Sequence, residues 1–580
     1  MNPSDSKAAS SQPVAEAFPP PCRSEPPFGR LPFGLTRQQL FVLGSILAAT
    51  ALVYFKSLSN NFVFDDVPEI VQNRLLPTSQ FLTASLTHDI WFFRDPSHLP
   101  QSNFYRPVQN LWLALNWRLF HYNPAGWHAA KILLHLAVVV LAFRIAQRLA
   151  GSVPAALVAA GLFAISPVQV EAVAWITAIP EALAALFMMS AFCLYIGIGQ
   201  AQPRSHLGFW PLLLYAGAAF THEGALLFPA LIFAYEWLLG EAGPSSVGKT
   251  GWNRLREPIA RGFRAAIPFA GVALLYLGAR VAVFGWSGLD AAHVQALSGW
   301  GFHLTGQTAD TSHSSADILM SLPSVITEYL ALIVLPWLPG PAHPVYFVTA
   351  PSMGNFWLPA IILGLVIAGG SWVLWRSSRR NLYAFGIAWW AIMLAPALHL
   401  NSLFAIMNDR YEYMPLFGWC LIAGDWSART LWQGRLPRPA AIIGCAAVAI
   451  TMTVFSWRGQ AAWHDDLTLF SQSVAAAPGS PRLHVVLAKA LFEQGAMEDG
   501  AGQLRQASLE EPQNKALQQL LEQVNLFIAR RREAQQEADA LNAVYDILAP
   551  WQNRSLNPAA SRAGGRSSLG GRPASPGAPY

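Results

Sequence analysis

Two adjacent carboxylates, Asp65 and Asp66, follow closely on the first long apolar run of the chain, residues 41–58. A spanning helix needs about 20 apolar residues, so this acid pair falls where a membrane helix emerges into water. Charge is costly near the membrane interface, and ionisable residues there are candidates for function. The simpler alternative is a turn that ends the helix, with Pro68 enforcing the break. A carboxylate in this place has the chemistry of a general base toward a hydroxyl group.

Other polar residues of unusual kind lie at the outer ends of predicted spans. They are Glu69, Arg106, His128, Glu171, Glu181, Glu223, Asp409 and Arg410. Singly, each has an ordinary structural explanation, such as a snorkelling side chain or a satisfied interhelical hydrogen bond. We favour that explanation for Glu69, His128 and Glu181. Several acids and at least two arginines on one face indicate a single cavity for a charged substrate.

A lipid-phosphate-linked sugar fits such a cavity, because its tail lies in the bilayer, its phosphate at the interface and its sugar in water. A transferase needs a carboxylate to take the proton from an incoming hydroxyl. It also needs cations to stabilise the departing phosphate. Asp65 or Asp66 fits the first role. Arg410 or Arg106 fits the second. The other acids that we expect in the substrate site are Glu171, Glu223 and Asp409.

The composition places these residues in a membrane protein. The chain is 53% hydrophobic and only 12% charged, whereas a soluble domain carries about twice that charge. Its net charge of +5 is modest and falls largely in short loops, so nucleic acid is not an expected partner. The four cysteines fall in the N-terminal tail or in apolar runs, which favours neither a disulfide framework nor a thiolate metal site.

Lysine and arginine in the short loops set the predicted topology, because they favour the cytoplasmic side. The fold class is all-α and polytopic, with about eleven transmembrane helices. Residues 1–36 are a disordered cytoplasmic tail, residues 37–457 the transmembrane domain, and residues 60–126 a large first outer loop. The predicted spans are residues 41–58, 127–149, 154–165, 182–199, 209–220, 225–239, 267–284, 357–375, 384–398, 413–423 and 440–457.

The apolar stretch 322–338 is excluded from this count. If it crossed the membrane, the span 357–375 would run outward and place Arg376, Arg379 and Arg380 outside. The positive-inside rule opposes that arrangement. We therefore predict a helix that lies on the outer face or re-enters it.

After residue 457 the pattern becomes that of soluble helices. Pro478 and Pro512 are 34 residues apart, which is the tetratricopeptide period. Residues 458–550 are therefore predicted to form a small tetratricopeptide-like domain with one full repeat and a long capping helix. A generic helical hairpin is the alternative. Residues 551–580, rich in Gly, Ser, Pro, Ala and Arg, form a disordered tail.

Short motifs follow one another in a characteristic order along the chain. They are Phe62-Val63-Phe64-Asp65-Asp66, Tyr105-Arg106-Pro107, Asn123-Pro124-Ala125-Gly126-Trp127-His128, the stretch 166–176 with Glu171, then Glu223, and Asp409-Arg410-Tyr411. In this order they resemble the GT-C superfamily of polyprenyl-phosphate-sugar glycosyltransferases. The closest likeness is to the transmembrane O-mannosyltransferases that carry tetratricopeptide repeats, and it covers residues 40–515.

The chain departs from the family pattern at four places, one of which is Asp409-Arg410, where the family often has Glu-Arg. It has Ser166-Pro167 where the family usually has His-Pro, and His222-Glu223 where the family has Lys-Glu. At Ala178-Ile179-Pro180-Glu181 an arginine that the family carries is missing. The loss of two cations points to a different donor sugar or to weakened catalysis.

The resemblance implies an inverting glycosyltransferase that moves a sugar from a polyprenyl phosphate to an acceptor at the outer face of the membrane. The repeats favour a protein acceptor, because such arrays present a concave peptide-binding surface. The expected location is a bacterial inner membrane, with the active site and C-terminal domain on the periplasmic side. Neighbouring side chains of an extended segment point to opposite sides, which would turn Asp66 inward and Asp65 toward the cavity. Asp65 is therefore the expected base.

Three alternatives stay open. The protein could modify a lipid or a glycan, as other members of the superfamily do. It could also be a non-catalytic scaffold whose repeats recruit partners. A transporter is disfavoured, because transporters place their sites near the midplane of the membrane. Paired carboxylates can hold Mg²⁺ or Mn²⁺, but the spacing is Asp-Asp rather than Asp-x-Asp, so we expect no metal and no cofactor.

Overall fold

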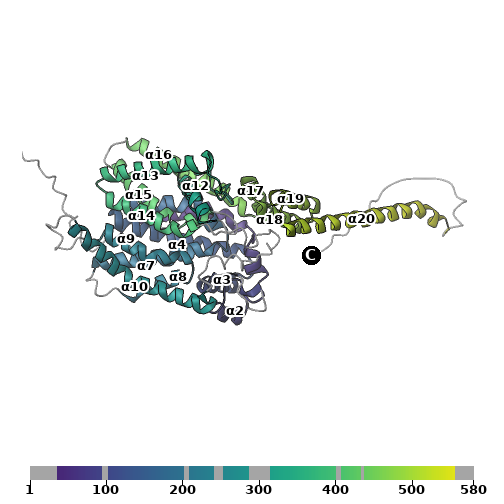
Figure 1. The fold of residues 1–580 in the computed structure, drawn as a ribbon, viewed down its shortest axis with the longest axis horizontal. Coiled ribbons are helices and arrows are strands. Elements are labelled where there is room, and N and C mark those ends of the chain that lie inside the picture. The colour runs from purple at the N-terminus through teal and green to yellow at the C-terminus, as the bar shows by residue number, and fades with distance from the viewer. Residues whose placement is uncertain are drawn as a thin grey trace, which may run out of the picture.

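The structure is a computed structural model, and it describes residues 35–94, 102, 104–201, 208–240, 252–286, 314–399, 407–432 and 437–555. Within these residues the chain forms a bundle of apolar helices, and four further helices, α17 to α20, project from one end of it (Figure 1). The two predicted tails lie almost wholly outside the described residues.

Local sequence signals fix the ends of the bundle helices. The helix α4 (Pro124–Ala150) begins at Asn123, whose side chain accepts a hydrogen bond from the backbone of Ala125, and it ends at Gly151 with a φ of 67°. A glycine suits this left-handed position because it has no Cβ to clash. The helix α1 (Arg37–Tyr54) begins with a capping box between Thr36 and Gln39.

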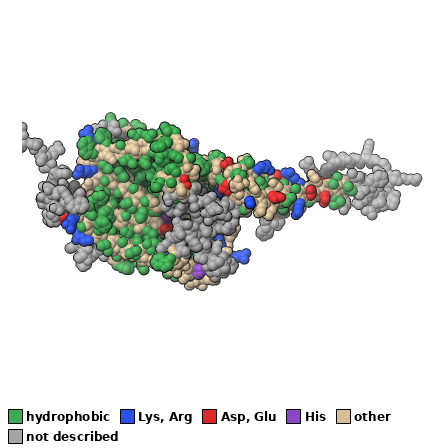
Figure 2. Space-filling view, viewed as in Figure 1, with side chains coloured by type: hydrophobic (Ala, Val, Ile, Leu, Met, Phe, Trp, Pro, Cys, Tyr) green, Lys and Arg blue, Asp and Glu red, His purple; other side chains and the backbone are tan. Residues whose placement is uncertain are grey.

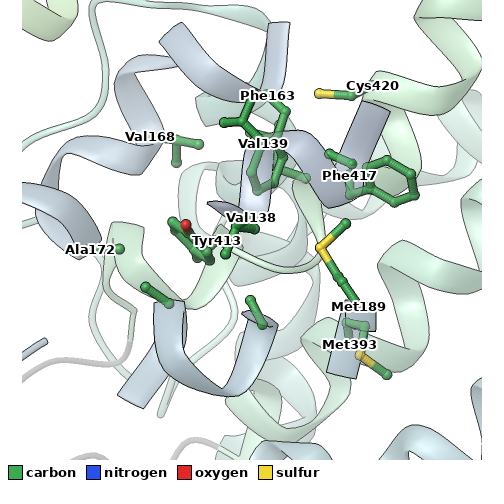
Figure 3. Packing of buried hydrophobic residues seen from close by; sticks show 14 of the residues in the cluster. Val138, Val139, Phe163, Val168, Ala172, Met189, Met393, Tyr413, Phe417 and Cys420 are labelled. Carbon is green, nitrogen blue, oxygen red and sulfur yellow. The ribbon is translucent and has the colours of Figure 1, made fainter. Parts of the chain in front are cut away.

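The centre of the bundle is packed closely through small residues. Helix α4 packs on α5 (Val153–Ile165), and α5 packs on α15 (Leu416–Trp432). On α14 (Arg380–Leu394), a Cβ atom added to Gly386 would lie 2.7 Å from the carbonyl oxygen of Gly418, so only glycine permits this backbone approach. Figure 3 shows Phe163 of α5 and Phe417 of α15 in the apolar core that results.

The exterior of the bundle is apolar. None of the described residues of α13 (Leu358–Arg376) is buried, although the helix is apolar on every side. Hydrophobic side chains cover the visible face of the bundle, and Lys and Arg side chains line the end away from the projecting helices (Figure 2). This distribution is that of a protein whose outer surface lies in lipid.

The other bundle helices complete the predicted set. They are α7 (Ile179–Ala201), α8 (Phe209–Ala219), α9 (Phe228–Leu238), α10 (Trp252–Phe284), α12 (Ser315–Val334) and α16 (Arg438–Gly459). Every predicted span therefore contains a helix, and the all-helical polytopic fold is confirmed. The count of eleven is not, because only eight described helices are long and apolar enough to cross, or nine if the bent pair of α5 with the stretch 167–174 is one span.

Length explains the difference. Helix α15 has 17 residues, and helices α8 and α9 have only 11 each. At about 1.5 Å per residue such a helix is much shorter than a hydrocarbon core about 30 Å thick. Helix α12, which was expected not to cross, is among the eight candidates by length and composition, so its placement stays a prediction.

The first outer loop has a small core of its own. It contains η3 (Val67–Val71), α2 (Ser79–Ala84), η4 (Phe92–Arg94) and α3 (Pro107–Phe120). Ile70, Phe81, Phe92 and Leu113 pack together in that core. The described part of the loop thus forms a platform next to the end of the bundle from which α17 to α20 project.

The C-terminal helices are α17 (Asp466–Ala476), α18 (Pro481–Glu493), α19 (Met497–Glu510) and α20 (Lys515–Ser555). Helices α18 and α19 form the predicted repeat hairpin, whose turn contains Gly495 with a φ of 81°. Gly500 of α19 leaves room for the ring of Phe492, where a Cβ would collide. The small residues at the helix crossing are therefore required by packing.

The side of the membrane reached after α12 can be tested directly. A reporter fused after Gly340 should appear outside, like one fused after Trp457, because the opposite topology would leave three arginines outside. A reporter fused after Arg380 is the control and should give a cytoplasmic signal. A cytoplasmic signal after Gly340 would show that α12 crosses, and the orientation of every later helix would have to be reversed or recounted.

Candidate functional site

The carboxylate of Asp66 is fully buried and holds the acidic loop in place. One oxygen accepts a hydrogen bond from the backbone N–H of Val63 at 3.1 Å, within its own loop. The other accepts from the backbone N–H of Thr177 at 2.8 Å, in the short connection before α7. Asp66 therefore joins the acidic loop to the bundle.

Asp65 lies in a different environment. It follows Phe64, a non-glycine residue with a φ of 53°, and its side chain is half-buried. The Oδ1 atom of Asp65 is buried and has no hydrogen-bond partner within the described residues. Burial raises the pKa of Asp65 to about 7, with Arg94 and Arg410 opposing this shift and the nearby carboxylates Asp66 and Asp466 adding to it. A carboxyl group with this pKa can exchange a proton near neutral pH.

Arg410 is held on three sides. It lies in η14 (Asp409–Glu412), and its guanidinium and its backbone N–H both bind the Glu171 carboxylate, the latter at 3.0 Å. A second carboxylate, Glu181, lies 3.4 Å from Nε of Arg410. The guanidinium also lies over the Trp175 ring, 5.1 Å from its centroid. These contacts fix the direction of its fork.

Buried apolar contacts anchor this arginine segment in the bundle. Tyr413 follows it directly and is fully buried. Its hydroxyl lies 2.8 Å from Nδ1 of His135 on α4, and its ring lies edge-on to Phe163 with centroids 5.6 Å apart (Figure 3). The arginine is therefore carried by a rigid element rather than by a mobile loop.

Arg106 forms the second ion pair of the site. Its Nε and Nη2 atoms donate to one oxygen of Glu223, at 2.9 and 2.7 Å. Burial works against the ionised form of Glu223, but Arg106 and His222 outweigh it and lower the pKa of Glu223 to about 2. The other oxygen, Oε1, is buried and makes no hydrogen bond with any described atom.

Asp409 binds a neighbouring loop through both of its carboxylate oxygens. It accepts a hydrogen bond from the backbone N–H of Gly340 at 2.7 Å, and its Oδ1 lies 2.7 Å from Nε2 of His343. Both partners follow α12 in the chain. The carboxylate thus fastens the segment after α12 beside Arg410.

The sequence interpretation set Glu69 and Glu181 aside, and it missed Lys131 and Arg94. Glu69 is 4% exposed and accepts from Gln109 at 3.4 Å, beside the acid pair, and Glu181 adjoins Arg410. Lys131 is 1% exposed, and its ammonium donates to the carbonyl oxygens of Trp175 and Ile176 at 2.9 and 3.1 Å. The signal for Lys131 was present, because a lysine inside an apolar span needs a partner. Nothing in the sequence distinguished Arg94.

The part of the chain that the structure describes holds no group of three or more His, Cys, Asp or Glu placed to bind a metal ion. Among the described residues, Glu223 and Glu171 are paired with the guanidiniums of Arg106 and Arg410, and Asp66 with backbone N–H groups. The expectation that no metal takes part remains a prediction.

The fold and this cluster define a class: a polytopic helical membrane protein with paired acids and arginines at the end of the bundle that carries the C-terminal helices. A family model for the tetratricopeptide repeat matches residues 460–524. The protein O-mannosyl-transferase TMTC4 of Mus musculus is 23% identical over 499 residues, which is 77% of this chain and 63% of that protein. The human protein O-mannosyl-transferase TMTC1 is 24% identical and covers 78% of this chain and 53% of its own length.

These relatives confirm the resemblance to transmembrane O-mannosyltransferases with tetratricopeptide repeats. The chain spans less than two thirds of each of them. Among solved structures, the Archaeoglobus fulgidus oligosaccharyltransferase aligns with 73% of this chain and 55% of its own, at 11% identity and a TM-score of 0.39. That likeness is too distant to support an argument.

The different environments of the two acids predict different effects on stability. Asp66→Ala leaves two buried N–H groups without an acceptor, and each costs about 1 to 3 kcal/mol, so we expect a loss of about 2 to 4 kcal/mol. Asp65→Ala removes a carboxylate whose buried oxygen lacks a partner, and we expect less than about 1 kcal/mol. Thermal unfolding in detergent compares the two variants. Equal losses would contradict the structural role of Asp66.

Proposed function

We propose that this protein is an inverting glycosyltransferase that moves a sugar from a polyprenyl-phosphate donor to a hydroxyl group of a protein acceptor. The observation that carries the proposal is the state of Asp65: a buried carboxylate oxygen that has no hydrogen-bond partner among the described residues, under the influence of the positive charges of Arg94 and Arg410. The names of the relatives, protein O-mannosyl-transferases, support the class of reaction.

In the proposed reaction, Asp65 takes the proton from the acceptor hydroxyl while the oxygen of that hydroxyl attacks the anomeric carbon of the donor sugar. The bond from that carbon to the phosphate oxygen breaks, and the phosphate leaves with the electron pair. A single displacement inverts the anomeric configuration. The raised pKa of Asp65 suits this step, because a general base is most effective when its pKa lies near the working pH.

Arg410 stabilises the negative charge of the departing phosphate. Glu171 and Glu181 hold its guanidinium in a fixed direction, so little reorganisation is needed when the charge develops. Arg106 supplies a second cation, kept in place by Glu223. The free oxygen of Glu223 is available to accept a hydrogen bond from a sugar hydroxyl.

The acidic loop contacts the start of α17, so the cluster lies at the end of the bundle from which the repeats project (Figure 1), whereas lysines and arginines line the opposite end (Figure 2). The positive-inside rule then supports a site on the outer face. In a bacterial inner membrane this face is periplasmic, where a peptide acceptor can reach both the site and the repeats. A lipid or a glycan is the alternative acceptor. An assay that offers each kind of acceptor in turn distinguishes it from a protein acceptor.

The role of Asp65 is tested with purified protein, a panel of polyprenyl-phosphate sugars and a hydroxyl-bearing peptide. We expect Asp65→Asn to lower turnover about 100-fold or more while donor binding stays within about twofold, because a base acts in the transition state. Since the ionised form is the active one, kcat/KM of the parent should fall as the pH drops below about 7. Free polyprenyl phosphate is the readout.

If Asp65→Asn turns over like the parent with every donor that the parent uses, the protein is not a transferase of this kind. A parent without activity on any donor would favour a scaffold whose repeats recruit partners.

Arg410 gives an independent test of the phosphate site. Arg410→Ala should reduce transfer about 100-fold or more, and Arg410→Lys should also reduce it, because lysine keeps the charge but loses the planar fork. Glu171→Gln is the matched control: it retains the guanidinium and loosens its support, so a smaller loss is expected. Membrane insertion and thermal unfolding are measured on all three. Normal transfer by Arg410→Ala would assign the phosphate to Arg106.

A further inference from the structure

The first helix of the repeat domain touches the acidic loop directly. The backbone N–H of Phe64 donates a 2.7 Å hydrogen bond to Oδ1 of Asp466, at the start of α17. Three residues earlier, the backbone N–H of Asn61 donates to the carbonyl oxygen of His464 at 2.9 Å. The loop that carries Asp65 is therefore held by a segment 402 residues away in the chain.

This hydrogen bond acts at the strained point of the loop. Phe64 has a φ of 53°, a left-handed conformation that is unfavourable for an aromatic residue and persists only when its surroundings impose it. The Phe64 ring also packs between two aromatic rings. It lies edge-on to the ring of Phe470 in α17, with centroids 5.7 Å apart, and its centroid lies 5.5 Å from that of the Trp175 ring. Asp65 is the next residue, so the conformation of Phe64 sets the direction of its side chain.

The same contact reaches the arginine side of the site. Trp175 stacks on Trp463, just before α17, with centroids 5.4 Å apart and planes 13° from parallel. The Arg410 guanidinium lies over that Trp175 ring. The stack of Trp175 on Trp463 thus links the start of the repeat domain to the acidic loop and to Arg410.

Two neighbouring aspartates at this junction have different tasks. Asp465 caps its own helix, because its side chain accepts a hydrogen bond from the backbone N–H of Thr468 at 2.8 Å. Asp466 turns back to the acidic loop. Asp465 is thus a matched control for Asp466.

We propose that Asp466 is a positioning residue of the transfer site: it holds Phe64 in the left-handed conformation and so aims the Asp65 carboxylate. The proposal rests on the proposed function. It makes the first repeat helix part of the site, so the element that binds a peptide acceptor also directs the base. The repeats are then not a separable recruitment module.

The test uses the full chain and the same donor and peptide assay. Asp466→Ala removes the acceptor of the Phe64 N–H, and we expect kcat to fall about 10-fold or more with donor affinity unchanged, because misplacement of a catalytic group lowers the rate and not the binding. Asp465→Asn retains a capping side chain and should behave like the parent. Asp466→Asn keeps an acceptor for Phe64 and should restore most of the turnover lost in Asp466→Ala.

The pH profile of Asp466→Asn gives a second readout. The charged groups that act on Asp65 are Arg94, Asp66, Glu69, Arg410 and Asp466. Removal of one negative neighbour favours ionised Asp65, so the acidic limb of the profile should move to lower pH. An unmoved limb would show that Asp466 does not lie beside Asp65 in the working enzyme, which contradicts the contact on which the proposal rests.

The outcomes separate the two proposals. Parental kcat in Asp466→Ala, with Asp65→Asn inactive, overturns the role of Asp466 and leaves the proposed function intact. Parental turnover in Asp65→Asn overturns the proposed function itself. If Asp466→Ala does not fold, the Asp466→Asn variant decides. The proposal is overturned if the acidic limb of its pH profile lies at the same pH as in the parent.

Discussion

The burial of charge at one end of an apolar bundle is the constraint on which this structure depends. Arg410 and Glu171 are both largely withdrawn from water, and each would be costly alone. Their pairing joins the short helix α6 (Val170–Ala174) to the segment before α15. The buried Asp66 makes a comparable connection through the backbone N–H of Thr177. The polar contacts that a catalytic site would need therefore also hold these helix ends together.

The repeat helices are also fixed to this end of the bundle by direct contacts. The helices α17 to α20 project from the bundle, but their first turn packs against Phe64 and, through Trp463, against Trp175. A domain joined only by a linker would be free to reorient. Here hydrogen bonds and stacked rings fix the junction, so the repeats have a defined direction relative to the acidic loop.

Much of the site could be found from the sequence, because its residues have unusual types for their positions. An acid pair after a span, or an arginine before Pro107, stands out in a chain with few charges. Glu69 and Glu181 were set aside, since a single acid at a helix end has an ordinary explanation. Their place in the cluster depends on Gln109 and Arg410, which lie far away in the chain. Asp409 was expected among the substrate acids, and in the structure its carboxylate binds Gly340 and His343.

The sequence by itself determined the helices, their apolar exteriors and the repeat hairpin, because hydrophobicity and the 34-residue period act over short stretches of chain. It did not determine the number of crossings, since helices of 11 residues such as α8 and α9 are ambiguous by length. Only the tertiary structure decided the partners of each acid. Asp66 and Thr177 are 111 residues apart, and Phe64 and Asp466 are 402 apart. Such pairs form because a buried polar group needs a partner, and the fold alone decides which one is within reach.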